Sequence, residues 1–350
     1  MLSTDLTTNT AMKKIFWVLT MALALVSAPA EAKKKDKTTP EEKGLQTINI
    51  NTAKTHVEFL ASDLLKGRAA GTEWGHIAGE YLISILRLMG ATPLMEDGYV
   101  QHFDAYSPYN NRTMTYYVDT TTVECTKLAP HRKAHMRNIL AKIEGKNPEE
   151  IIVVGAHYDH LGYDPMLSGD KIYNGADDNA SGVQAVLQLL QAFMATGQQP
   201  ERTVIFALWD GEEVGLCGSK YFVNNFPDIK KVKAYMNYDM IGRNNMEHRP
   251  QQLKYLYSAK DSVYATWLKS DIEKYSLALD PDFLPSEDLS GGSDQVPFFK
   301  AGASIVWYHT DGHPDYHRPS DEPERINWSK MVDITKASFL CLWKMANNAF

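Results

Sequence analysis

The sequence predicts an α/β fold in which a mostly parallel central sheet is covered by helices on both faces. Continuous apolar segments, such as 151–156 and 203–209, are typical of strands that are buried on both faces. Segments with helical periodicity alternate with them, as expected when crossover helices join parallel strands. Residues 51–350 contain no repeat and no linker, so we expect a single domain there.

Several segments carry apolar residues at helical spacing. Residues 55–89 are predicted to form two helices, separated by a glycine-containing turn at 66–72. The segment 181–195 has an apolar stripe, and Gly197 follows it as a helix-ending residue. We expect further helices at 218–226, 262–275 and 329–346.

Strands are predicted where apolar or β-branched residues gather between turn signals. The segment 99–123 is rich in Tyr, Thr and Val and is interpreted as edge strands. Residues 138–145 and 151–156 are interpreted as a strand pair joined by the polar turn 146–150. Further buried strands are expected at 203–209, 232–239 and 304–308.

The chain begins with the pattern of a secretory signal peptide at residues 1–32. The basic Met12-Lys-Lys precedes an apolar stretch at 15–26, and the small residues of Ala30-Glu-Ala supply a cleavage site. The apolar stretch is short for a membrane span, so we expect no stable membrane insertion after cleavage. An uncleaved N-terminal anchor is the alternative.

This pattern predicts an exported protein, either periplasmic or extracellular. Residues 1–11 lack targeting character, so Met12 is a second candidate start. Residues 33–50 begin with a cluster of lysines and are expected to form a disordered tether before the single domain at 51–350.

Composition excludes some classes of function. The net charge is −7 and the isoelectric point about 5.9, so the chain lacks the basic surface of a nucleic-acid-binding protein. Its cysteines, Cys125, Cys217 and Cys341, are too widely spaced for a zinc-binding motif and allow at most one disulfide.

Candidate metal ligands gather where the predicted strands end. In chain order they are His157, Asp159, His160, Asp177, Asp178, Asp210, Glu212, Glu213, Asp239, His309, His313 and His317. The carboxyl ends of parallel strands meet at one edge of a sheet, so these side chains should lie close together. Imidazole nitrogens and carboxylate oxygens are ligands that zinc accepts, and a carboxylate can bridge two ions.

The two adjacent glutamates, Glu212 and Glu213, are expected to have different roles. Neighbouring like charges repel, so a partly buried pair needs a cation or a shared proton. Two metal ions held about 3.5–4 Å apart can activate one water and polarise one carbonyl. One glutamate would bind metal while the other accepts the proton of the water. We therefore expect two Zn²⁺ per chain, for which manganese or cobalt could substitute.

Four segments at these strand ends are His157-Tyr-Asp-His-Leu-Gly, Gly175-Ala-Asp-Asp-Asn-Ala-Ser-Gly, Glu212-Glu-Val-Gly-Leu and Tyr316-His-Arg-Pro-Ser-Asp. In this order they resemble the motifs of the co-catalytic zinc aminopeptidases. That superfamily includes secreted bacterial leucyl aminopeptidases, glutamate carboxypeptidase II, glutaminyl cyclases and the inactive transferrin-receptor ectodomain. The resemblance extends over about residues 55–347 and implies an α/β fold of the zinc exopeptidase type.

The resemblance also implies a role for each matching residue. The ligands would be Asp178 bridging both ions, Glu213 and His317 on one ion, and His157 and Asp239 on the other. Glu212 matches the general base, and Asp159 matches the carboxylate that orients His157. Tyr316 matches a tyrosine that hydrogen-bonds the oxyanion in some relatives. The peptide between Asp178 and Asn179 is expected to be cis.

Other residues near the motifs have less specific interpretations. Three more histidines are expected to form hydrogen bonds rather than bind metal: His160, His309 and His313. Asp177 and Asp210 are expected to support ligands or cap a helix, and Trp209 to lie in the core. Gln295 replaces a His that many relatives carry, which leaves a substrate contact at this position open.

Together these assignments predict an exported metallo-aminopeptidase that acts on peptides with a free N-terminus. A glutaminyl cyclase and a carboxypeptidase for acidic peptides are alternatives on the same scaffold. A non-catalytic, receptor-like binding domain is the alternative of another class. The presence of all five ligands together with Glu212 argues against that last alternative.

Overall fold

The computed structural model describes residues 38–109 and 114–348, so the predicted signal peptide lies outside the described residues. These residues contain a nine-stranded sheet with the order β1-β3-β7-β4-β8-β11-β9-β10, in which β2 also pairs with β3. The strands are β1 (Thr92–Pro93), β2 (Val100–Pro108), β3 (His131–Ile143), β4 (Asn147–His157), β7 (Arg202–Trp209), β8 (Val232–Tyr238), β9 (Gln252–Ser258), β10 (Asp280–Ser286) and β11 (Ser304–His309). A separate ribbon contains β5 (Gly162–Tyr163) and β6 (Ile172–Tyr173).

The centre of the sheet is parallel. Strands β7, β4, β8 and β11 run in one direction, whereas β3 and β9 are antiparallel to their neighbours β7 and β11. This arrangement confirms the predicted mostly parallel α/β fold. It also brings the carboxyl ends of the four central strands to the same edge of the sheet.

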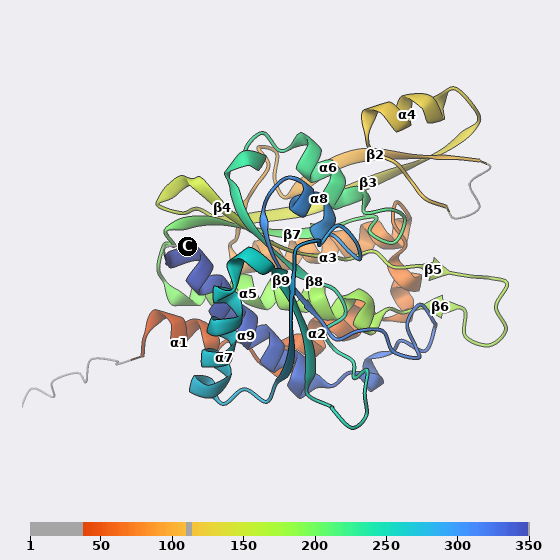
Figure 1. Cartoon of the computed structure of the whole chain (residues 1–350). Helices are drawn as coiled ribbons and strands as arrows, with labels where there is room; N and C mark the ends of the chain where they lie inside the picture. Colours follow the sequence, from red (N-terminus) through yellow and green to blue (C-terminus); the bar gives the residue numbers. More distant parts are fainter. Residues whose placement is uncertain (1–37, 110–113, 349–350) are drawn as a thin grey trace, which may run out of the picture. The chain divides into compact units, whose positions relative to one another are not determined.

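Helices cover both faces of the sheet (Figure 1). One face packs against α1 (Pro40–Leu45), α2 (Ile50–Leu60), α3 (Glu73–Met89), α5 (Gly182–Thr196), α7 (Val263–Tyr275) and α9 (Trp328–Asn347). The other face packs against α6 (Cys217–Asn225) and α8 (Gln295–Lys300). Alternate residues of β4 supply the two cores: Ile152 and Val154 face the first, and Ile151 and Val153 the second. Burial on both faces explains why the strand segments are continuously apolar.

The prediction of a disordered tether at 33–50 is wrong for the part that the structure describes. Helix α1 begins with a capping box, in which the hydroxyl of Thr39 accepts from the amide of Glu42 and the carboxylate of Glu42 accepts from the amide of Thr39. Gly44 packs so closely against Phe339 of α9 that a Cβ would lie within 2.4 Å of its ring. Glu41, Glu42 and Lys43 therefore belong to a docked helix.

Two strand predictions also need correction. The segments 138–145 and 151–156 are not a pair, because β7 lies between β3 and β4 and hydrogen-bonds to both. Part of the predicted edge-strand segment is helix α4 (Thr120–Lys127), which Asp119 caps through the amide of Thr122. Strands β9 and β10 and helix α8 were not predicted.

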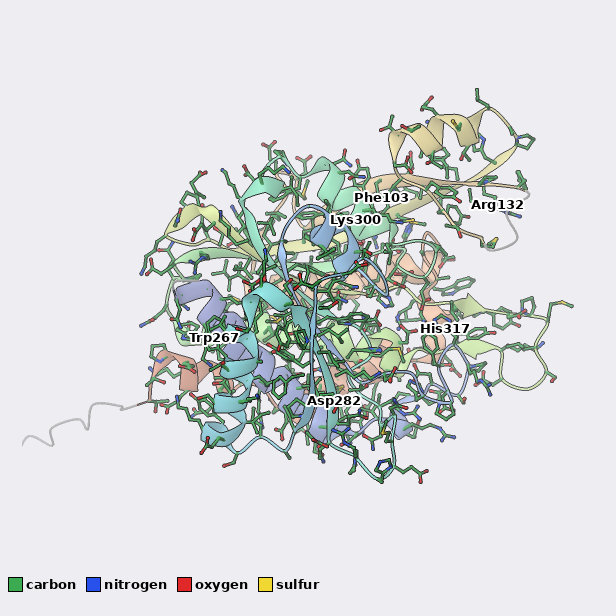
Figure 2. All side chains as sticks on the ribbon, viewed as in Figure 1. Phe103, Arg132, Trp267, Asp282, Lys300 and His317 are labelled. Carbon is green, nitrogen blue, oxygen red and sulfur yellow. The ribbon has the colours of Figure 1, made fainter. Side chains whose placement is uncertain are left out.

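Strands β2 and β3 extend beyond the sheet as an arm, with α4 at its far end (Figure 1). Phe103 lies on this arm and Arg132 near its tip (Figure 2). No helix in the described ranges is long and apolar enough to cross a membrane. All three cysteines are free thiols.

The buried His56 of α2 should make stability depend on pH. Its Nδ1 lies 2.8 Å from the hydroxyl of Tyr81, and burial lowers its pKa from 6.5 to about 4. Between these two values the unfolded chain binds the proton and the folded chain does not, so stability falls as pH falls. We expect this histidine to contribute a loss of up to about 1.4 kcal/mol per pH unit in that window.

Denaturant unfolding of the parent and of His56→Gln, at several values between about pH 7 and pH 5, measures this contribution. The variant should lose this part of the pH dependence. The exposed His248→Gln serves as the control and should keep it. Identical slopes for the parent and His56→Gln would contradict the assignment.

Candidate active site

The predicted metal ligands meet at the carboxyl edge of the parallel strands. His157 is the last residue of β4, Glu213 follows β7, and Asp239 directly follows β8. Asp178 lies in the turn Ala176–Ser181 that leads into α5, and the Asp178–Asn179 peptide is cis as expected. His317 lies on the loop after β11, on the side of the domain where β5 and β6 extend (Figure 2).

Asp178 stands between two groups of ligands. Its Oδ1 lies 3.3 Å from Nε2 of His157, which is itself 3.6 Å from Oδ1 of Asp239. Its Oδ2 lies 3.2 Å from Nε2 of His317, which is 3.1 Å from Oε2 of Glu213. One carboxylate oxygen thus faces each group, which is the arrangement that a bridging ligand requires.

The geometry of these residues fits two metal ions. The Nε2 atoms of His157 and His317 are buried and have no hydrogen-bond partner among the described residues, although carboxylate oxygens surround them. Donor atoms of His157, Asp178 and Asp239 all lie within 4.8 Å of one another. Donors that converge without bonding to each other are what a cation between them would explain, and this set suits zinc.

Glu212 lies beside this cluster. A cavity of about 240 Å³ is lined by Glu212 together with Asp178, Glu213 and Asp239. Burial raises the pKa of Glu212 well above its usual range, and the negative charges of Glu213, Asp239 and Asp294 act in the same direction. Nearby cations would lower this pKa again, which leaves a carboxylate suited to accept and return a proton.

The role predicted for the Asp159 carboxylate is not the one that the structure shows. The Nδ1 of His157 lies 3.1 Å from the backbone oxygen of Asp159 and 3.7 Å from its carboxylate. The carboxylate instead accepts from the amides of Glu212 and Glu213 at 3.0 and 3.3 Å. Asp159 therefore orients His157 through its backbone carbonyl, and its side chain holds the turn that carries the glutamate pair.

The three other histidines of this region occupy different positions. His160 is buried, and its Nδ1 lies 2.6 Å from Oε1 of Glu213, so it contacts a predicted ligand directly. His309 contacts the backbone oxygen of Asp239 and lines the cavity. His313 lies behind the site, with Nε2 3.2 Å from the carboxylate of Asp177.

Two buried residues hold the ligand-bearing loops in place, and the sequence analysis missed both. Arg68 is fully buried and donates to the carbonyl oxygens of Leu60, Tyr158, Asn174, Gly175 and Asp178. Asp321 accepts from the amides of Asp177 and Asp178. Asp321 ends one of the four motif segments and Arg68 lies in the turn at 66–72, but no local pattern indicates the distant groups that they reach.

The remaining predicted residues lie around the cavity or behind it. Tyr316 lies on the cavity rim, 45% exposed, with its ring stacked 3.8 Å from that of His317. Asp210 is buried and accepts from the amide of Arg137, so it supports the sheet edge. Trp209 lies in the core as predicted. Gln295 is fully buried and bonds to Asn237 and Gly291, away from the cavity lining.

Comparison with solved structures defines the class of fold. The chain superimposes on a zinc aminopeptidase from Bacillus subtilis with a TM-score of 0.64, at 16% identity over 86% of this chain and 96% of that one. A glutaminyl cyclase from Porphyromonas gingivalis gives a TM-score of 0.60, at 17% identity over 84% of this chain and 98% of that one. The fold is therefore that of the zinc exopeptidases.

Comparison of sequences then identifies the family. The pattern of peptidase family M28 matches residues 138–341, and the chain belongs to this family. It is 32% identical over 170 residues to leupeptin-inactivating enzyme 1 of Streptomyces exfoliatus, covering 48% of this chain and 34% of that protein. It is 32% identical over 209 residues to a probable leucine aminopeptidase of Arthroderma otae, covering 57% and 55%. The chain thus spans about a third to a half of the length of these relatives.

Replacing Arg68 with Lys should loosen the ligand loops. A lysine has three donors on one nitrogen, so at least two of the five carbonyl oxygens would lose their partner. Each buried unpaired group costs about 1–3 kcal/mol, so we expect the free energy of unfolding to fall by at least about 2 kcal/mol. Zinc affinity should fall by about tenfold or more, because the support of the ligands is lost.

Denaturant unfolding and competition with a zinc chelator measure the two effects separately. The matched control is Arg249→Lys, at a surface arginine paired with Asp280 and Asp282, which should change stability by less than about 0.5 kcal/mol. Unchanged zinc affinity in Arg68→Lys would show that this residue does not position the ligands.

Proposed function

We propose that this chain is an exported metallo-aminopeptidase that hydrolyses the first peptide bond of substrates with a free N-terminus. The observation that carries the proposal is the position of Asp178 between two His-carboxylate groups, with Glu212 beside them. Membership of peptidase family M28 and relatives named as aminopeptidases support it. Export is proposed from the secretory pattern of residues 1–32.

The residues of the chain would divide the work as follows. Asp178, His157 and Asp239 would hold one zinc ion, and Asp178, Glu213 and His317 the other. When bound, the zinc ions would supply the Lewis acidity that activates a water and polarises the scissile carbonyl. Glu212 would take a proton from the attacking water and deliver it to the leaving amine. The hydroxyl of Tyr316, at the cavity rim, would donate to the developing oxyanion.

The cavity favours the N-terminal end of a peptide. Its volume of about 240 Å³ suits one residue, and its walls combine the carboxylates with Met240, Trp307 and His309. With zinc bound to the other three carboxylates, Glu212 remains as an unligated negative group that attracts an α-ammonium group. A carboxypeptidase for acidic peptides would need a cationic group here, and no Lys or Arg is among the described residues that line the cavity.

A substrate profile tests the proposal. The zinc-loaded chain should release the first amino acid from peptides with a free N-terminus and leave the N-acetylated forms of the same peptides intact. Removing the metal with a chelator should abolish release, and added zinc or cobalt should restore it. Mass spectrometry of the products separates every alternative.

Each alternative gives its own product. A glutaminyl cyclase would convert a Gln-peptide to its pyroglutamate form without releasing an amino acid. A carboxypeptidase would act on acetylated peptides from the other end. A binding domain would leave all peptides unchanged, and any of these outcomes would overturn the aminopeptidase proposal.

The variant Glu212→Gln tests the general base. We expect it to keep its zinc, because Glu212 is not one of the proposed ligands, and to lose about 10²–10⁴-fold in turnover. The adjacent Glu213→Gln is the matched comparison, and it should lose zinc as well as activity. Metal content measured beside the rate separates the two roles. Parent-like turnover in Glu212→Gln would show that another group moves the proton.

A further inference from the structure

A second acidic pocket lies beside the loops that carry the candidate ligands. It has a volume of about 390 Å³ and is bordered by the end of α2, the turn after it, Asn174 and the segment 322–328. Its carboxylates are Glu58, Asp63, Glu322 and Glu324. None of them belongs to the proposed zinc ligands or lines the active-site cavity.

Two buried oxygen atoms of the residues lining this pocket lack a hydrogen-bond partner. Asn174 is only 2% exposed, and its Nδ2 donates to the carbonyl of Ala61 at 2.7 Å and to Oδ1 of Asp63 at 2.8 Å. These two bonds fix the orientation of the amide and leave Oδ1 as its unpaired atom. The hydroxyl oxygen of Ser62 is also buried without a partner. Buried polar atoms are normally satisfied, so both oxygens need a partner that the described residues do not supply, and a bound ligand would be one.

The negative charge of the pocket is also uncompensated. Across 38–109 and 114–348, no ion pair joins any of its four carboxylates to a basic side chain. Lys54 lines the pocket, but its Nζ lies over the ring of Trp328, 5.3 Å from the centroid. Burial, followed by the charges of Glu324, Asp170 and Asp63, raises the pKa of Glu322 to about 7.

We propose that this pocket binds one calcium ion through oxygen atoms of Asp63, Asn174 and Glu322. A set of carboxylate and amide oxygens without an imidazole or thiolate donor suits a hard cation. Calcium accepts irregular shells of six to eight oxygens, while magnesium demands a near-ideal octahedron. Residues from three separate segments, as here, are more easily matched by calcium.

A calcium ion at this position would stabilise the active-site loops without touching them. Asn174 precedes Gly175, whose carbonyl Arg68 holds, and Glu322 follows Asp321, which bonds to the amides of Asp177 and Asp178. The ion would tie both segments to the end of α2. The site does not depend on the proposed reaction, so it stands or falls independently of the peptidase assignment.

Calcium chloride titrated into the zinc-loaded full chain tests the proposal. Calorimetry should show one calcium ion per chain with a Kd of about 10⁻⁴–10⁻³ M, as in other extracellular modules. The melting temperature should rise by a few degrees, on the order of 3–5 °C at saturation. Zinc content, measured before and after, should stay unchanged. Terbium, which replaces calcium at oxygen sites, should luminesce through excitation of Trp328, and Trp328→Phe should lose that signal.

Two variants locate the ion. Glu322→Gln and Asp63→Asn should each weaken calcium binding by about tenfold or more, whereas Glu287→Gln at an exposed carboxylate outside the pocket should not. Without calcium, Glu322→Gln should melt at a higher temperature than the parent, because it removes an unpaired charge. Added calcium should raise the melting temperature of the parent but not that of Glu322→Gln.

Two results would overturn the proposal. One is the absence of calcium-dependent heat and of any melting shift in the parent, up to about 10 mM calcium, tenfold above the weakest expected Kd. The other is an equal calcium affinity in Glu322→Gln, Asp63→Asn and the Glu287→Gln control, which would place the ion elsewhere. Neither result would change the outcome expected for the substrate profile, which tests the proposed aminopeptidase activity separately.

Discussion

The repulsion among buried carboxylates at the carboxyl edge of the sheet is the constraint on which the rest of this structure depends. Donor oxygens of Asp178 and Asp239, of Asp178 and Glu213, and of Glu212 and Glu213 lie within 4.8 Å of each other. At that separation, and at the effective dielectric of a protein, two ionised carboxylates repel by about 3.5 kcal/mol. The raised pKa of Glu212 is one response to this repulsion. Even one such pair is a sizeable fraction of the stability of a typical domain. The fold therefore needs positive charge at this edge, and its loops need restraints that keep the acids together.

The chain itself supplies part of the positive charge and part of the restraints on the loops. Arg68 places a permanent cation behind the cluster and uses four donors to tie the end of β4 to the turn that carries Asp178, while a fifth bonds to Leu60 of α2. Asp321 fixes the same turn from the other side, and the Asp159 carboxylate fixes the turn of Glu212 and Glu213. The ligands are thus held by backbone hydrogen bonds as well as by their own contacts. Preorganisation of this kind limits the cost of gathering the acids before metal arrives.

The candidate ligands predicted from the sequence lie together in the structure because their signal is local. His157, Asp178, Glu213 and Asp239 each lie next to a strand end or a helix start, and strand direction alone brings such ends together. The partners of Arg68 lie up to 110 residues away, so no periodicity could reveal them. The position of β7 between β3 and β4 was not predicted for the same reason. The two adjacent segments have the pattern of a hairpin, but each pairs instead with β7, which lies about 60 residues later in the chain. The charged residues around α1 led to the prediction of a disordered tether. Its docking depends on the close approach of Gly44 to α9, which the sequence does not indicate.

The two sides of the cluster are not equivalent, and the difference indicates how a substrate would approach. The side chain of His157 is 1% exposed, whereas that of His317 is 37% exposed and stacks on Tyr316 at the cavity rim. His157 is fixed at the end of a central strand, but His317 lies on a loop. The position of this loop depends on contacts such as that of Asp321 with the amide of Asp177 and that of Arg243 with Asp315. In the proposed reaction, a peptide would therefore enter past the His317 side and meet Glu212 against the more deeply buried His157 side. Whatever stabilises the loop from His313 to Glu322 then supports His317 directly and supports Asp178, which faces both ligand groups, through Asp321. The second acidic pocket lies at the end of that loop.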